Sequence, residues 1–124
     1  FVYSIAFERT RINEMIRDFP QYREPLESIN NRMVDLIIPF RKKYYRTETM
    51  EGSSSIKKVL PALCPELSYH DLEIGDGMAA SNAFLDLYYC NDEQHIQHVR
   101  QNLLKYCGLD TLAMVKVLEV LEKV

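Results

Sequence analysis

The sequence has 124 residues, enough for one domain or part of one, and its 47% hydrophobic and 27% charged residues suit a globular protein with a core. A net charge of −3 argues against a protein that covers nucleic acid with its whole surface, although it does not exclude a local basic strip. No apolar run reaches about 18 residues and no signal peptide is recognisable, so we expect no membrane span and a cytoplasmic location.

The N-terminal part predicts a strand followed by a helix. Phe1 to Tyr3 is rich in β-formers and resembles the end of a strand already under way, so we expect a fragment of something longer. A helix is predicted from Ile5 to Phe19, and Glu8 heads its apolar stripe. Two interpretations of Glu8 stay open: a functional acid on the buried face, or a charge that complements the helix dipole.

A second helix and a short strand are expected next. Two prolines bracket the turn before the helix, which is predicted from Glu24 to Asn31. The stretch from Met33 to Ile38 predicts a short buried strand that carries one acid, Asp35. Pro39 follows at the strand end, where the missing backbone N–H is tolerated.

A local excess of positive charge follows. Between Arg41 and Lys58 six basic residues face two acids, Glu48 and Glu51, which gives a net charge of +4 (six minus two) inside a chain of −3. The run Arg41-Lys42-Lys43-Tyr44-Tyr45-Arg46 interleaves cations with tyrosines, a pattern suited to phosphate contact and base stacking. A solvated charge run with two packing tyrosines explains the same residues equally well.

A serine-rich loop precedes the next helix. Thr47 to Ser54 is loop-like, and Ser54 or Ser55 is a natural N-cap for a helix that Pro61 and Pro65 should end. Serines and lysines at a helix N-terminus also suit a phosphate, so Ser55, Lys57 and Lys58 are candidate phosphate contacts. The spacing of a P-loop is absent.

The C-terminal half predicts two further helices. Ser68 to Gly77 should be irregular, Met78 to Tyr89 helical, and Asn91 or Asp92 should cap the helical pattern that comes next. Familiar metal motifs are not indicated: the acids near Asp76 lack the EF-hand spacing, and the three cysteines contain no C-x-x-C pair. His95 and His98 are three residues apart, which is more typical of solvent-facing side chains than of ligands.

The stretch from Leu104 to Thr111 links the last two amphipathic patterns. On a helical wheel, Asp110 shares a face with the apolar residues that follow it, and Tyr106 lies one turn earlier. Gly108 could end one helix and Asp110 could cap the next. Alternatively, Asp110 is a functional carboxylate that points toward the core and needs a donor, a cation or a metal.

Three motifs in this order resemble a known superfamily. They are Val2-Tyr3-Ser4-Ile5-Ala6-Phe7-Glu8, then Val34-Asp35-Leu36 followed by Gly52 to Val59, and finally Tyr106-Cys107-Gly108-Leu109-Asp110. They resemble the second and third motifs of the DnaQ-like (DEDD, tyrosine-type) 3′–5′ exonucleases, which have an RNase H-like fold. Nearly the whole chain also resembles the C-terminal part of an uncharacterised bacterial family, a domain of unknown function.

The superfamily resemblance implies two-metal hydrolysis of phosphodiester bonds in DNA or RNA. In that chemistry carboxylates hold two Mg²⁺ or Mn²⁺ ions, which activate a water and stabilise the transition state. Asp110 and Glu8 would be metal ligands, and Tyr106 would orient or deprotonate the water. Lys57, Lys58, Ser55, Arg41, Lys42 and Lys43 would contact the nucleic acid.

Two departures from the family pattern limit this expectation. Glu8 stands where the family has Asp, and the first motif, Asp-x-Glu, is missing and would lie upstream of Phe1. We therefore expect residues 1–124 to be a single partial domain of an α/β parent, mostly helical with two or three short strands, inactive alone and without bound metal. The alternative is a degenerate, non-catalytic module that binds nucleic acid or a protein. A truncated sheet would expose an edge, through which the chain could form a homodimer.

Overall fold

The computed structural model describes residues 1–124, and helices account for 68% of them while strand accounts for only 2%. The chain divides into two compact units, Phe1–Val59 (unit 1) and Leu60–Val124 (unit 2), with the boundary inside one short helix. The expectation of a single partial domain over residues 1–124 stays a prediction.

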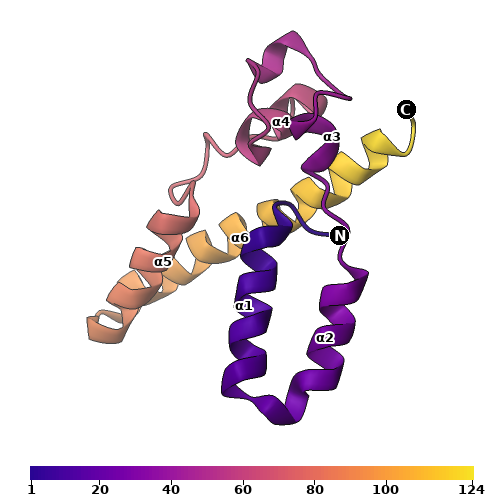
Figure 1. Ribbon diagram of the computed structural model, residues 1–124. Helices are drawn as coiled ribbons and strands as arrows, with labels where there is room; N and C mark the ends of the chain where they lie inside the picture. The colour runs from indigo at the N-terminus through magenta and orange to yellow at the C-terminus, as the bar shows by residue number, and fades with distance from the viewer. The chain divides into compact units, whose positions relative to one another are not determined.

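Unit 1 begins with a helical hairpin. Helix α1 (Ile5–Asp18) and helix α2 (Arg23–Arg32) lie side by side and are joined by a 3₁₀ turn, η1 (Pro20–Tyr22) (Figure 1). Both helices begin and end within one residue of the predicted bounds. The ring of Pro20 fixes φ at the first position of the turn, which suits the reversal of the chain.

The predicted strands do not form. Phe1–Tyr3 and Met33–Ile38 meet in one isolated parallel bridge, in which Val2 N–H donates to Val34 and Leu36 N–H donates to Val2, each at 2.9 Å. No sheet follows from this bridge, so the α/β RNase H-like fold expected from the resemblance is wrong for this structure. An open sheet edge therefore cannot be the surface for a homodimer, and self-association stays a prediction.

The rest of unit 1 is built from short elements around a small core. Helix α3 (Ile38–Arg41), the 3₁₀ turn η2 (Glu48–Met50) and the start of helix α4 (Ile56–Leu63) follow in order. The buried side chains of this region are Leu36, Ile37, Phe40, Met50 and Val59. Pro61 does not end α4 as predicted, since the helix continues to Leu63.

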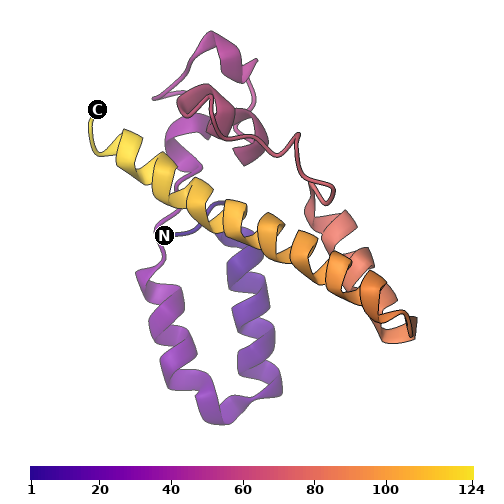
Figure 2. The same ribbon diagram turned by 180° about the vertical axis from the view of Figure 1, so that it is seen from behind.

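Unit 2 contains two helices that lie side by side, α5 (Gly77–Asp86) and α6 (Glu93–Leu121), linked by the 3₁₀ turn η3 (Leu87–Tyr89) (Figure 2). Asp92 caps α6 as predicted, because its carboxylate accepts hydrogen bonds from the N–H groups of Gln94 and His95. Ala113 and Val117, on one face of α6, are fully buried. No helix of the chain is both long and apolar enough to cross a membrane.

Candidate functional site

The positively charged stretch is shaped by a tight turn after α3. The carbonyl of Pro39 accepts hydrogen bonds from the N–H groups of both Tyr44 and Tyr45, at 2.8 and 3.2 Å. Lys43 takes a left-handed conformation, with φ of 61°, which reverses the chain at this point. We call Arg41 to Lys58 the basic segment, and all of it belongs to unit 1.

The two tyrosines of the basic segment point to different surroundings. Tyr45 is half-buried and packs on the core residue Phe40 edge to face, with ring centroids 5.7 Å apart. The side chain of Tyr44 is 77% exposed, and the ammonium group of Lys42 lies 5.9 Å from its ring centroid. One tyrosine therefore holds the segment in place, while the other presents an aromatic face to solvent.

Most cations of the basic segment have no acidic partner. All six basic residues are exposed, and only Lys58 forms an ion pair, with Glu51 at 2.7 Å. Arg41 acts on Asp35 at longer range, where it helps to lower the pKa of that carboxyl. The other predicted contact, Ser55, is exposed just before α4, and its N–H donates to the hydroxyl of Ser53.

Asp35 connects the start of α1 to the chain that precedes the basic segment. Its buried carboxylate accepts three backbone hydrogen bonds, from Ser4 at 2.9 Å, Ile5 at 3.0 Å and Ile37 at 3.1 Å. Burial raises the pKa of Asp35, but these donors and Arg41 outweigh it and hold the pKa below its usual range. Asp35 thus caps α1 from a distance and joins its start to the chain that enters α3.

A third link ties the N-terminus to the serine-rich loop. The hydroxyl of Tyr3 donates to the carbonyl of Ser54 at 2.6 Å, and its ring lies 6.4 Å from that of Phe40. Burial and the charge of Asp35 raise the pKa of Tyr3, so the hydroxyl remains a donor at neutral pH. Tyr3 therefore connects α3, which leads into the basic segment, to the serine-rich loop within that segment.

In unit 2, Asp110 is not a helix cap. Helix α6 runs without interruption through Gly108, so the backbone groups near Asp110 are already paired within the helix. The carboxylate of Asp110 accepts a hydrogen bond from the hydroxyl of Tyr69 at 2.6 Å. The capping interpretation is excluded, and Asp110 is a partly buried acid whose partner is a neutral hydroxyl.

Two tyrosines surround this acid. Tyr106 lies 6.3 Å from Tyr69 between ring centroids, and burial followed by the charge of Asp110 raises its pKa to about 12. Burial and the hydrogen bond to Asp110 raise the pKa of Tyr69 as well. Both phenols stay protonated at neutral pH and act as hydrogen-bond donors. The roles predicted for Tyr106 and Asp110 in catalysis remain predictions.

Glu8 lies in the other unit. It occupies the first turn of α1, is half-buried and lines a pocket of about 350 Å³ in unit 1 together with Arg32, Ile12 and Ile29. Asp110 belongs to unit 2. No group of three or more His, Cys, Asp or Glu side chains gathers in the structure, so the residues present do not fit a two-metal centre.

A second polar cluster in unit 2 contains His98, one of the two histidines considered in the sequence analysis as possible metal ligands. His98 lies 2.9 Å from Glu73, and the amide of the buried Asn102 donates to the same carboxylate at 2.9 Å. Sequence patterns did not reveal this cluster or the Tyr69–Asp110 contact, because Glu73 and Tyr69 lie in the irregular segment, where no periodicity applies. Of the three free cysteines, only Cys64 is buried.

Comparison with known proteins gives one match. A family model described as "Domain of unknown function (DUF2779)" matches residues 1–55. This match ends just before α4 begins at Ile56 and does not include the Tyr106-to-Asp110 motif, so the resemblance to an uncharacterised family is supported for the N-terminal part of the chain. No curated protein and no solved structure matches the chain.

Proposed function

We propose that this chain binds nucleic acid through the basic segment of unit 1. The observation that carries the proposal is the set of exposed cations, Arg41, Lys42, Lys43 and Arg46, none of which forms an ion pair within the protein. Free cations attract phosphates, and release of the counterions around the nucleic acid drives this association. The local charge of +4 is large enough to act within a chain that is acidic overall.

Tyr44 favours single strands over duplexes. Its exposed ring lies beside the ammonium of Lys42 and is free to stack on a base. Unpaired bases of single-stranded DNA or RNA offer such a face, whereas the bases of a duplex are stacked on one another. Cations that alternate with an exposed aromatic ring are the combination used to follow a single strand without reading its sequence.

The test is fluorescence anisotropy with a labelled single-stranded oligonucleotide at fixed salt. In one variant Arg41, Lys42, Lys43 and Arg46 are all replaced by Gln, which keeps much of each side chain and removes the charge. The matched control replaces four other cations without ion pairs by Gln: Arg9, Arg32, Arg100 and Lys105. We expect affinity to fall by on the order of a hundredfold in the first variant and severalfold at most in the control. Equal losses would contradict the proposal.

A second candidate function is metal-dependent hydrolysis of phosphodiester bonds by a longer protein that contains this chain. The observation that favours it is the position of Asp110, a partly buried acid inside a helix that neither caps the helix nor pairs with a cation. Mg²⁺ or Mn²⁺ prefers carboxylate oxygens, and Asp110 would supply one ligand. Unit 2 does not gather the further carboxylates that such a centre needs.

This candidate predicts that residues 1–124 alone do not degrade single-stranded DNA or RNA with Mg²⁺ or Mn²⁺. A longer protein that also carries an upstream Asp-x-Glu strand should degrade them, and Asp110→Ala should abolish that activity. The assay follows the length of an end-labelled oligonucleotide with time. Activity of the longer protein that survives Asp110→Ala would contradict the assigned role of Asp110.

A further inference from the structure

A small pocket opens beside the basic segment. It has a volume of about 60 Å³, and its apolar lining comes from Phe40, Tyr45 and Met50. Phe40 and Met50 are almost completely buried, so the floor of the pocket is part of the core of unit 1 and is rigid. The pocket therefore has a fixed floor in a region otherwise made of loops and short helices.

The remaining lining is polar and positively charged. Lys43 and Arg46 contribute two cations, while Gly52 and Ser53 contribute the loop on the other side. No acidic residue lines the pocket, and the neighbouring Glu51 is paired with Lys58 at 2.7 Å. The pocket is thus electropositive, because both of its charges have the same sign and neither is neutralised.

Neutral hydrogen-bond donors in the same loop also make the pocket suitable for an anion. The backbone N–H of Gly52 has no hydrogen-bond partner in the chain. The hydroxyl oxygen of Ser53 accepts from the N–H of Ser55 at 3.2 Å, which leaves its own O–H free to donate. Gly52 has φ of +76°, a conformation that suits glycine and brings the chain back toward the cations.

The size of the pocket restricts its ligand. Pockets for nucleosides and other drug-sized molecules usually enclose about 300–1,000 Å³, several times more than this one. A phosphate group is compact, carries negative charge and accepts hydrogen bonds on all of its oxygens. Two cations, a free backbone N–H and a hydroxyl are the donors that such a group needs.

We infer that the pocket lined by Lys43, Arg46, Gly52 and Ser53 is a binding site for a phosphate group of the nucleic acid. This inference rests on the proposed function, and it adds a specific site for one phosphate of the bound strand. Tyr44 lies in the chain between two pocket residues, Lys43 and Tyr45, so a base next to the bound phosphate is within reach of its exposed ring. The other cations of the segment contact the strand less specifically.

The test compares two cations of the same segment. Arg46 lines the pocket, whereas Lys57 is exposed, unpaired and outside it. Arg46→Gln should lower the affinity for a single-stranded oligonucleotide about tenfold, and Lys57→Gln should lower it less than about threefold. Inorganic phosphate, followed by ¹H–¹⁵N NMR, should shift the amide signals of Gly52 and Ser53, and Arg46→Gln should remove these shifts.

The outcomes separate this inference from the proposed function. If both variants lose affinity equally and phosphate shifts neither amide, the pocket is not a phosphate site, although the segment still binds nucleic acid. If phosphate shifts the amides but no oligonucleotide binds, the pocket binds phosphate, but the proposed function fails and so does the assignment of the pocket to a phosphate of nucleic acid. If neither occurs, both fail.

Oligonucleotides with and without a terminal phosphate show whether the pocket binds a terminal or an internal phosphate. Tighter binding of the phosphorylated strand that depends on Arg46 assigns the pocket to a strand end. Equal binding of the two strands, again dependent on Arg46, assigns it to an internal phosphate. Binding of both strands that does not depend on Arg46 would overturn the inference.

Discussion

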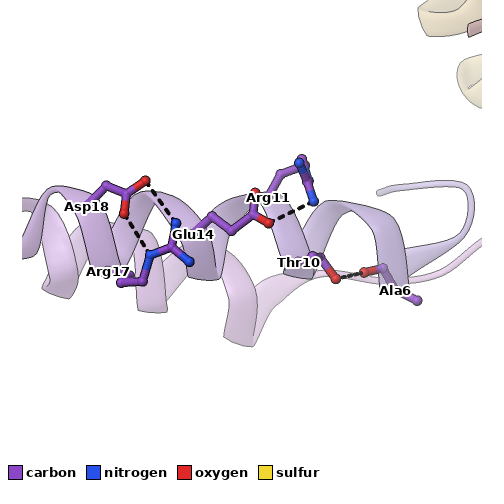
Figure 3. Close-up of polar contacts among 6 residues, drawn as sticks. All are labelled: Ala6, Thr10, Arg11, Glu14, Arg17 and Asp18. Carbon is purple, nitrogen blue, oxygen red and sulfur yellow. Dashed lines mark hydrogen bonds and ion pairs between the residues drawn. The ribbon is translucent and has the colours of Figure 1, made fainter. Parts of the chain in front are cut away.

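Two regions of unit 1 carry several arginines or lysines but differ in how those charges are balanced. On α1, Arg11 pairs with Glu14 at 2.8 Å and Arg17 pairs with Asp18 at 2.7 Å (Figure 3). In the basic segment, four cations between residues 41 and 46 have no such partner. On α1 an acid lies one helical turn from Arg11 and another lies next to Arg17 in the chain, whereas the acids of the basic segment lie beyond the turn that exposes its cations.

The comparison shows that a count of charges is a poor guide to function. Paired surface charges such as those of α1 stabilise a protein very little and attract few external ions. Unpaired cations in one place leave a positive field that an external anion can neutralise. The basic segment is therefore the place to look for a partner, and α1 serves as an internal control in the same unit.

The largest effect should come from Asp35, which holds both regions together. Asp35→Ala leaves the N–H groups of Ser4, Ile5 and Ile37, which are buried or partly buried, without their acceptor and should destabilise unit 1 by about 3 kcal/mol. Chemical denaturation followed by circular dichroism measures this loss. An unchanged free energy of unfolding would show that the carboxylate does not organise the unit.

The same carboxyl predicts a pH dependence. Its pKa is lower in the folded than in the unfolded protein, so its contribution to stability is complete above the unfolded pKa of about 3.9. The contribution is lost as the pH falls from there through the lower folded pKa. The free energy of unfolding should therefore decrease as the pH falls below about 4, and this decrease should be smaller in Asp35→Asn. Equal losses in the two proteins would contradict this role.

The next largest effects should differ between Tyr44 and Tyr45. Tyr44→Ala should weaken binding of single-stranded nucleic acid about tenfold without changing stability, since its ring is exposed. Tyr45→Ala should instead destabilise unit 1 by about 1–2 kcal/mol, because its ring packs on Phe40. Anisotropy and thermal unfolding of both variants measure the difference. Binding by Tyr44→Ala as tight as that of the unmodified chain would contradict a role of this ring in base stacking.

The smallest effects concern single charges in the two regions. Lys42→Gln should weaken binding about threefold through the loss of one phosphate contact. Arg11→Gln should change neither affinity nor stability beyond about 0.5 kcal/mol, because an exposed ion pair contributes little. Both values come from the same binding and unfolding experiments. A larger loss of affinity for Arg11→Gln would place α1 in the binding surface.

The sequence predicted the two long helices of unit 1 well, but it missed α3 and predicted strands that do not form. Apolar periodicity and prolines located α1 and α2 within a residue at each end. The segments around Val2 and Val34 have the composition of strands, but their pairing stops after one bridge, because Ser4 and Asp35 turn to form the cap of α1. Propensity alone does not show that a longer ladder has no partner.

In unit 2, a local sequence signal suggested a helix break that the structure does not have. Gly108 suggested a break, but one glycine costs a helix only about 1 kcal/mol, and the buried residues Ala113 and Val117 follow on the same uninterrupted helix. The partner of Asp110 was not predictable, since Tyr69 is 41 residues away in the sequence. The basic segment was predictable from its charge, whereas the exposure of Tyr44 rather than Tyr45 depends on the turn at Lys43.

The most direct test of the central claim is the salt dependence of binding to a single-stranded oligonucleotide. Each phosphate neutralised should contribute about −0.7 to the slope of log affinity against log salt concentration. The variant with Gln at Arg41, Lys42, Lys43 and Arg46 should have a slope about 3 units shallower than that of the unmodified chain. The matched control should keep the original slope. Identical slopes for all three proteins would contradict binding through the basic segment.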